Sequence, residues 1–551
     1  MPVLDCGGLP LSDEPSWPTH DGDEVDREPP TVQVRRPDPP TVRMPAPPPP
    51  RPAAPAPEPA AARPRPPAEP AKEIKSEPEP NPEPITESEE PAPPARRRKR
   101  PLVLAAVVLL VLALAGTAVV GAQRGWFDRT PDATTAAPQP PAPISRAVQG
   151  VGTGGKQPTA AGVQAVLAGP AANGLLDPLR GTVVDPASGQ VLWRQDETTP
   201  ATPASTTKVL VAAAALLTLD HTSQLSTKVV RGPQPGTVVL VGGGDPTLSP
   251  LPAGETGFYP GAPTLDELVE QVRAQGPVTQ VLYDSSRYTG PGTAPGWAPS
   301  DVPDGYVSPI EPLMLTGGRS DPKADVSRRS ATPSADTAAL LAQRLGVASP
   351  VAPGAAPAGA QVLGEVKSVP VDQLVENMMQ LSDNVLGEVL SREVAIARGA
   401  EPSFTGGAQA VRAALTEHGF DLTGAVFEDG SGLSPSNKLP ARLLADILTA
   451  AAKPDASDER TARLRPLLTA LPVAGGSGTL AGRYAEQGAA GRGWVRAKTG
   501  TLTSVHSLAG VVLDTDGRLL VFAFMSLSGD DMKAVRGALD EMAAALRTCG
   551  C

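Results

Sequence analysis

An uncharged apolar run from Leu102 to Ala122 separates a proline-rich N-terminal segment from the rest of this 551-residue chain. The run is about long enough to cross a lipid bilayer as a helix. The basic residues Arg96–Arg100 precede it, and positive charge marks the cytoplasmic side of a span. The sequence therefore predicts a single-pass protein of the cell membrane. Residues 96–126 form the basic block that stops transfer of the chain and the transmembrane helix. Everything after Trp126 lies outside the cytoplasm. A cleaved signal peptide is the alternative, although the run lies behind about a hundred residues.

The segment before the span has the composition of a disordered cytoplasmic tail. Residues 1–95 consist largely of proline, alanine and acidic residues, which bury too little apolar surface to offset chain entropy. The tetrapeptide Pro-Pro-Thr-Val occurs at Pro29–Val32 and again at Pro39–Val42. Two interpretations stay open: a docking or phosphorylation site for a cytoplasmic partner or kinase, and accidental low complexity. Behind the span, residues 127–158 have the composition of a linker.

Residues 159–551 have the mixed pattern of an α/β domain. An apolar, alanine-rich stretch at Lys208–Leu219 predicts a helix. We further expect two strands around the turn Asp185–Gly189, a hairpin around Asp514–Gly517, and a terminal helix. Short strand-like pieces between Gly and Pro turns at about 222–340 predict an inserted subdomain. The expected ranges are Gly181–Trp193 for the first strand pair, Leu508–Leu513 and Leu519–Met525 for the hairpin, Asp531–Leu546 for the terminal helix, and Thr237–Val241 and Val278–Tyr283 for strands of the insertion.

Charge, histidine and cysteine placement exclude several kinds of function. The net charge of -11 argues against a nucleic-acid partner, because recognition of a phosphate backbone needs a basic surface. Beyond the span the histidines are His221, His418 and His506, which have no zinc-binding spacing, so we expect no metal and no other cofactor. Cys549 and Cys551 are expected to be idle thiols of a frayed tail, with a metal site or a disulfide as the alternatives.

Three short polar motifs follow one another along the α/β domain. They are Ser205-Thr-Thr-Lys208, Ser382-Asp-Asn384 and Lys498-Thr-Gly-Thr501. Each one alone is explained by an ordinary polar helix start, loop or turn. Together and in this order, they form the signature of class A β-lactamases and penicillin-binding proteins.

The first motif has the spacing of a serine nucleophile and its base. A serine hydroxyl is a poor nucleophile at neutral pH unless a positioned base takes its proton. Three residues further along a helix, Lys208 would lie on the same face as Ser205. Lysine acts as a base only when burial or a neighbouring cation lowers its pKa, and Lys498 is the expected second cation. The backbone N–H of Ser205, at the helix start, is expected to help hold an oxyanion.

The second and third motifs supply proton transfer and substrate binding. Ser382 is expected to relay a proton to the leaving amine and Asn384 to bind the substrate backbone, whereas Asp383 is expected to point elsewhere. The third motif follows a predicted strand, so Lys498 and Thr499 should stand at an exposed sheet edge that faces the serine. Such an edge can bind extended peptide. Its lysine and hydroxyls make a receptor for a terminal carboxylate, and the Thr501 N–H would complete the oxyanion hole. The predicted catalytic residues are Ser205, Lys208, Ser382, Asn384 and Lys498, and the predicted substrate-binding residues are Thr499, Gly500 and Thr501.

The chain resembles the class C, low-molecular-mass penicillin-binding proteins, the D-alanyl-D-alanine carboxypeptidase/endopeptidase family of the penicillin-binding protein 4 type. Further segments carry the likeness, which covers about residues 165–545: Leu240–Leu248, Tyr283–Tyr288, Pro295–Trp297, Asp429–Ser434 and Leu471–Gly475. The resemblance implies a β-lactamase/transpeptidase-like α/β domain with a subdomain inserted between the first two motifs. It also implies acyl-enzyme chemistry and covalent inhibition by β-lactams.

The expected function is therefore a serine-type D-Ala-D-Ala carboxypeptidase, with endopeptidase activity as a second expectation. It would trim peptidoglycan stem peptides through an acyl-enzyme on Ser205, without a cofactor. Two alternatives stay open: a β-lactamase, which would deacylate the drug quickly, and a catalytically quiet sensor of peptidoglycan or β-lactams.

Overall fold

The computed structural model of the protein describes residues 156–529 and 531–549. The predicted cytoplasmic tail, the membrane span and nearly all of the linker lie outside these residues, so those predictions remain untested. Within the described ranges, no helix combines the length and the apolar character that crossing a membrane requires.

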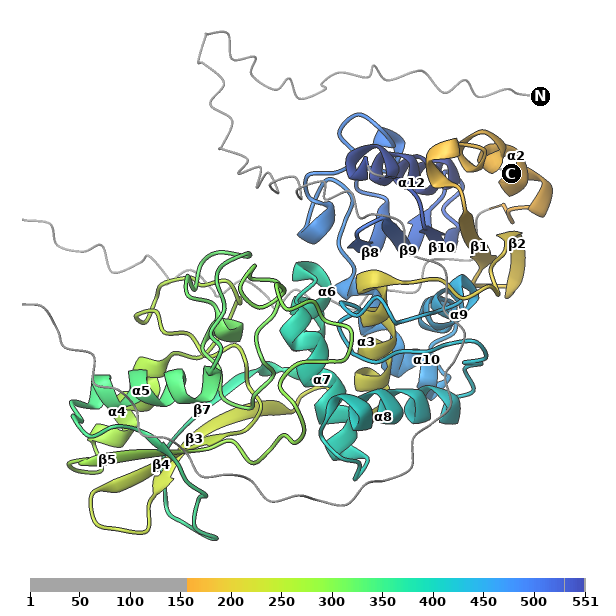
Figure 1. Ribbon diagram of the computed structural model, residues 1–551. Coiled ribbons are helices and arrows are strands. Elements are labelled where there is room, and N and C mark those ends of the chain that lie inside the picture. Colours follow the sequence, from red (N-terminus) through yellow and green to blue (C-terminus); the bar gives the residue numbers. More distant parts are fainter. Residues whose placement is uncertain (1–155, 530, 550–551) are drawn as a thin grey trace, which may run out of the picture. The chain divides into compact units, whose positions relative to one another are not determined.

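The N-terminal and C-terminal parts of the domain meet in one antiparallel five-stranded sheet, in the order β2-β1-β10-β9-β8 (Figure 1). Both predicted strand pairs are confirmed, and an aspartate shapes each turn. The Asp185 carboxylate accepts hydrogen bonds from Ala187 N and Ser188 Oγ, and the Asp514 carboxylate accepts from Asp516 N and Arg518 N. The strands are β1 Leu179–Asp185, β2 Gln190–Gln195, β8 Val495–Leu502, β9 Val505–Leu513 and β10 Leu519–Ser526.

Helices cover both faces of this sheet. Side chains alternate between the faces of a strand, and in β10 both sets are apolar. Phe522 and Phe524 pack toward α2 (Ala160–Ala171) and α12 (Met532–Arg547), while Ala523 faces the opposite helical half. The predicted terminal helix is thus confirmed, and Figure 1 shows α2 and α12 on one face and α3 and α9 on the other.

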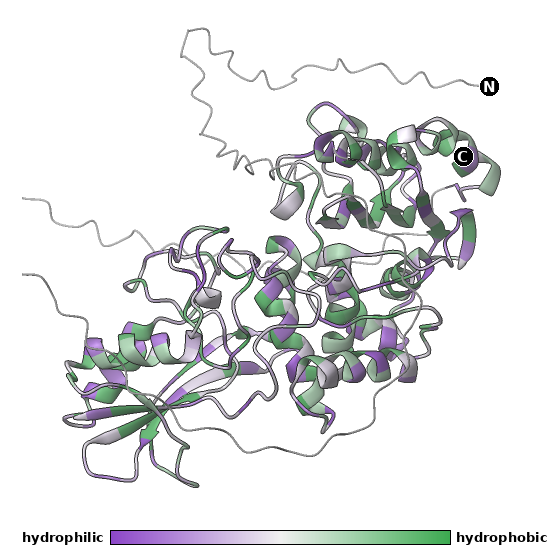
Figure 2. Ribbon diagram, viewed as in Figure 1, coloured by the Kyte–Doolittle hydropathy of each residue, from purple (hydrophilic) through white to green (hydrophobic). Residues whose placement is uncertain are grey.

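The helical half surrounds α3, the helix that follows the first motif. Ten consecutive residues, Lys208–Leu217, are buried in it, as expected for a helix that is apolar on all sides. Figure 2 shows its mostly hydrophobic character. The helices are α3 Lys208–Thr218, α6 Val371–Leu381, α7 Asn384–Ala397, α8 Phe404–Glu417, α9 Ala441–Ala452, α10 Glu459–Leu464 and α11 Pro466–Ala470.

The chain between α3 and α6 contains a second five-stranded sheet, in the order β6-β5-β4-β3-β7. β3 pairs antiparallel with β4 and β7, whereas β4, β5 and β6 are parallel neighbours. The inserted subdomain therefore extends to Pro370 and does not end near residue 340, because β7 returns along β3 before the chain enters α6. Its elements are β3 Gln224–Arg231, β4 Thr237–Gly242, α4 Leu265–Arg273, β5 Gln280–Asp284, α5 Pro333–Leu345, β6 Ala352–Pro353 and β7 Val362–Pro370.

Short 3-10 turns complete the described elements, and one of them carries Ser205. They are η1 Gly174–Leu176, η2 Ala204–Thr207, η3 Thr316–Gly318, η4 Gly478–Leu480 and η5 Ala489–Gly491. At the C-terminal end, Cys549 is buried and disulfide-bonded, so the expectation of an idle thiol at this position was wrong. The side chain packs into the core between α12 and the first sheet.

Candidate active site

The three sequence motifs converge at one place between the first sheet and the helical half. Lys208 Nζ donates to Ser205 Oγ at 3.0 Å and to Asn384 Oδ1 at 2.7 Å. Lys498 Nζ donates to Ser382 Oγ at 2.7 Å. The structure therefore joins the first motif to the second and the second to the third.

Ser205 lies in the turn η2, directly before α3. Ala204 has a φ of 49°, a left-handed conformation that is unfavourable for a residue with a Cβ. Ser507 on β9 holds this turn, because its hydroxyl donates to Pro203 O at 2.6 Å and contacts Thr206 Oγ1 at 3.2 Å. The sheet thereby fixes the backbone around the serine.

Gly500 is required at its position by close packing against the same turn. A Cβ built on it would lie 2.6 Å from Pro203 O and 2.2 Å from Ser507 Oγ. Both distances are too short for a Cβ, and because Pro203 O is a backbone atom, the turn itself would have to move. The glycine of the third motif thus lets β8 approach the serine turn closely.

Lys208 is fully buried and has three oxygen acceptors. The third is the backbone oxygen of Ser431, at 2.6 Å. Burial lowers the pKa of Lys208 to about 8, although the charges of Asp383, Asp429 and Glu388 oppose this shift. A large share of the lysine is therefore neutral near pH 8, and neutral lysine can accept the Ser205 proton.

The loop that presents the Ser431 carbonyl was missed as part of the site, although its Asp429–Ser434 sequence had contributed to the family resemblance. Glu388 on α7 holds this loop, since its carboxylate accepts from Gly430 N and from Ser431 N at 2.8 Å. Burial and the charge of Asp429 raise the pKa of Glu388 to about 7. An acidic residue within an apolar helical stretch was the available sequence signal for this role.

The second motif occupies the junction of α6 and α7. Asp383 points away from the reacting groups, as expected: it caps α7 by accepting from Leu386 N at 2.7 Å. Its other carboxylate oxygen accepts from Arg319 Nη2 of the inserted subdomain at 2.9 Å. Asn384 Nδ2 donates to Tyr306 O, also in the insertion, at 3.0 Å. The insertion thus contacts two of the three residues of this motif.

The third motif lies on β8, which is an edge strand of the first sheet. The predicted sheet edge is confirmed, but the Lys498 side chain is not exposed there: it is fully buried because it reaches inward to Ser382. Burial and the charge of Lys208 hold the pKa of Lys498 well below its usual value. Thr499 and Thr501 remain partly exposed, and their hydroxyls contact Thr479 Oγ1 at 2.9 Å and Arg536 Nη2 at 3.2 Å.

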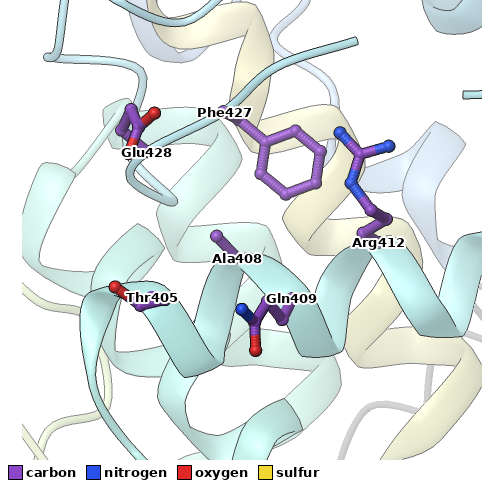
Figure 3. Close-up of a pocket in the computed structure, with 6 residues that line it drawn as sticks. All are labelled: Thr405, Ala408, Gln409, Arg412, Phe427 and Glu428. Atoms are coloured by element: carbon purple, nitrogen blue, oxygen red, sulfur yellow. The ribbon is translucent and has the colours of Figure 1, made fainter. Parts of the chain in front are cut away.

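A shallow pocket of about 180 Å³ lies away from these residues, on α8. Figure 3 shows Thr405, Ala408, Gln409 and Arg412 along one helix, with Phe427 and Glu428 opposite them. None of the predicted site residues lines it. In the part of the chain that the structure describes, no cluster of His, Cys, Asp and Glu is suited to holding a metal ion.

Comparisons with known proteins agree with this geometry. The model of the D-Ala-D-Ala carboxypeptidase 3 (S13) family matches residues 163–325 and 319–546. A carboxypeptidase of Mycobacterium tuberculosis is 46% identical over 422 residues, which cover 75% of this chain and 89% of that protein. Carboxypeptidase DacB of Mycolicibacterium smegmatis is 44% identical over 450 residues, covering 80% of this chain and 96% of the relative.

Among solved structures, penicillin-binding protein 4 (dacB) from Haemophilus influenzae has the same fold. Its TM-score is 0.55 at 21% identity, over 66% of this chain and 94% of that chain. The family match spans both sheets and all three motifs, and two relatives share more than two-fifths of the aligned residues. The chain therefore belongs to the D-Ala-D-Ala carboxypeptidase 3 (S13) family.

Proposed function

We propose that this protein is a serine D-Ala-D-Ala carboxypeptidase that removes the terminal D-Ala from peptidoglycan stem peptides through a Ser205 acyl-enzyme. The observation that carries the proposal is the 3.0 Å contact between Ser205 Oγ and the Nζ of a buried lysine whose pKa is about 8. The named carboxypeptidases among the relatives support the same reaction class.

Acylation begins when Ser205 Oγ attacks the carbonyl carbon of the penultimate D-Ala. Neutral Lys208 takes the hydroxyl proton, and Asn384 Oδ1 and Ser431 O stabilise the ammonium that forms. The backbone N–H groups of Ser205 and Thr501 hold the oxyanion of the tetrahedral intermediate.

Ser382 assists departure of the terminal D-Ala. Its hydroxyl oxygen accepts from Lys498 Nζ, which leaves the O–H free to donate to the leaving nitrogen. When the C–N bond breaks, that proton moves to the amine, and the proton that Lys208 took from Ser205 replaces it on Ser382, which leaves Lys208 neutral again. Water then attacks the ester carbonyl, with Lys208 again as the base, and Ser205 is regenerated.

The same chemistry predicts covalent inhibition by β-lactams. Ser205 opens the strained amide of the ring, but the amine that departs stays tethered to the acyl group. It therefore continues to occupy the space through which a hydrolytic water must approach. We expect a long-lived acyl-enzyme on Ser205.

The decisive experiment uses a peptide ending in D-Ala-D-Ala and measures released D-Ala. Ser205→Ala should abolish release, whereas Ser457→Ala, the same substitution at an exposed serine outside the site, should retain it. Penicillin labelling of Ser205 without release of D-Ala from peptide or peptidoglycan fragments would favour a sensor. Rapid turnover of penicillin would instead indicate a β-lactamase.

We further propose endopeptidase activity on cross-linked stem peptides. In such a substrate the amine that departs from the acyl-enzyme belongs to a second peptide rather than to free D-Ala. A purified cross-linked peptide dimer, analysed by mass spectrometry, should yield two monomers with the native protein and none with Ser205→Ala. An intact dimer under conditions where D-Ala is released would restrict the enzyme to carboxypeptidase work.

We also propose that residues 102–122 anchor the enzyme in the cell membrane, with the catalytic domain outside. The support is the uncharged apolar run behind the basic block Arg96–Arg100. Protease added to intact spheroplasts should digest the catalytic domain and spare residues 1–95. Recovery of the uncleaved full-length chain in the soluble fraction would contradict the anchor.

A further inference from the structure

Arg536 reaches the active-site strand from an element that contains none of the three motifs. It lies in the first turns of α12 and is half-buried. Its Nη2 and Nε lie 3.2 Å and 3.4 Å from Thr501 Oγ1. The guanidinium thus lies beside one of the hydroxyls that the sequence indicated as a carboxylate receptor.

The surroundings leave the charge of Arg536 without a counter-ion. The neighbouring Arg483 uses the Asp540 carboxylate in two hydrogen bonds, of 2.7 Å and 2.9 Å. Among the described residues, no carboxylate oxygen lies within 4.0 Å of the Arg536 guanidinium. Two arginines therefore lie near one carboxylate that only Arg483 contacts, and one positive charge remains unpaired at the end of β8.

His506 adds no charge beside Thr501. It lies opposite Thr501 in the pairing of β8 with β9. Burial and the charges of Arg536 and Arg483 lower the pKa of His506 to about 4, so the ring is neutral at physiological pH. The site beside Thr501 keeps its single excess positive charge.

The hydrogen bond from Arg536 also orients the Thr501 hydroxyl. Because Thr501 Oγ1 accepts from the guanidinium, its own O–H is free to donate to a ligand. A carboxylate placed there would receive that hydrogen bond together with charge-assisted bonds from the guanidinium. The pair is thus complementary to a carboxylate, and Thr501 belongs to the strand that would bind the substrate.

We propose that Arg536, together with Thr501, binds the terminal carboxylate of the departing D-Ala and so selects substrates with a free C-terminus. This inference rests on the proposed carboxypeptidase function. The alternative is that Arg536 only ties α12 to β8, and in that case its loss would affect every substrate equally.

The test compares one peptide ending in D-Ala-D-Ala as the free acid with the same peptide as the C-terminal amide. Arg536→Gln should lower kcat/KM for the acid by roughly 10- to 100-fold, the range expected for loss of a charged hydrogen bond. Its kcat/KM for the amide should stay within about twofold of the wild type on the same reasoning, and Arg536→Lys should recover part of the activity on the acid. Lys533→Gln, which removes the same charge from an exposed position of the same helix, should leave both substrates unchanged.

Acylation of Ser205 by penicillin and by its methyl ester provides a second, independent comparison. Arg536→Gln should slow acylation by the acid selectively, and thermal unfolding should show that the variant is folded. Equal losses on the charged and neutral forms, or no loss on either, would overturn the inference. Wild-type protein that is acylated by penicillin but releases no D-Ala would contradict the proposed function, while the penicillin comparison would still decide the role of Arg536.

Discussion

Arg319→Met tests whether the inserted subdomain holds the second motif in place. The Arg319–Asp383 ion pair is 2.9 Å long, and both side chains are 1% exposed. Arg319 also lies 3.6 Å from the centroid of the Phe258 ring and donates to Tyr259 Oη at 3.1 Å. Methionine would keep much of the buried volume but would leave the Asp383 carboxylate without its ion-pair partner.

The expected loss of stability is large because the Asp383 charge would stay buried without its ion-pair partner. Removing one partner of a buried ion pair costs about 3–5 kcal/mol of unfolding free energy. Burial acts to raise the pKa of Asp383, but Arg319 and Arg329 together lower it, so the carboxylate is charged at neutral pH in the native protein. Ser382 and Asn384 flank this carboxylate, and displacing them by about 1 Å should slow acylation on the order of 100-fold.

Urea unfolding and the rate of acylation by a fluorescent penicillin measure the two effects. The double variant Arg319→Met/Asp383→Asn should regain much of the stability, because asparagine can still cap α7 and leaves no unpaired charge. Lys323→Met, which breaks an exposed ion pair with Glu255 in the same subdomain, is the control and should behave as wild type. If Arg319→Met matches wild type in both assays, the insertion does not position the second motif.

Three further predictions concern the active site. The acylation rate should rise with pH around a midpoint near 8, because roughly half of Lys208 is neutral there, against roughly 0.3% for a lysine of ordinary pKa. A stopped-flow acylation rate that is the same from pH 6 to 10 would contradict a lysine base. Glu388→Ala should slow penicillin acylation about tenfold by releasing the Ser431 loop. Glu388→Gln should slow it less, because the side-chain oxygen of glutamine still accepts from the loop amides. Equal acylation rates for the two variants would refute this role of Glu388. Gly500→Ala should lower the free energy of unfolding in urea by about 1–3 kcal/mol and abolish acylation, because the alanine Cβ would lie 2.6 Å from Pro203 O. A stable, active variant would show that the turn can move.

Much of the site chemistry was predictable because it depends on local spacing. The three-residue separation of Ser205 and Lys208 places both on one helical face whatever surrounds the helix. The two hairpins of the first sheet were predictable for a similar reason, since Asp185 and Asp514 bond to backbone atoms only a few residues away.

Other features escaped prediction because they arise between distant segments. The end of the inserted subdomain depends on β7 pairing with β3, and no local pattern marks that pairing. The Ser431 carbonyl that accepts from Lys208 comes from a loop 223 residues further along the chain, and a backbone oxygen has no side-chain signature. The burial of Lys498 likewise depends on its reach across to Ser382.

The order of residues alone indicates which groups are available for the proposed reaction: a serine with a lysine one helical turn away, a second hydroxyl, an amide and a second lysine. Their protonation and their placement depend on the tertiary structure. Desolvation and neighbouring charges set the pKa values of Lys208 and Lys498, and packing alone placed Arg319 against Asp383 and Arg536 against Thr501. Electrostatic environment depends on what surrounds a group in space, and that information is absent from the order of residues along the chain.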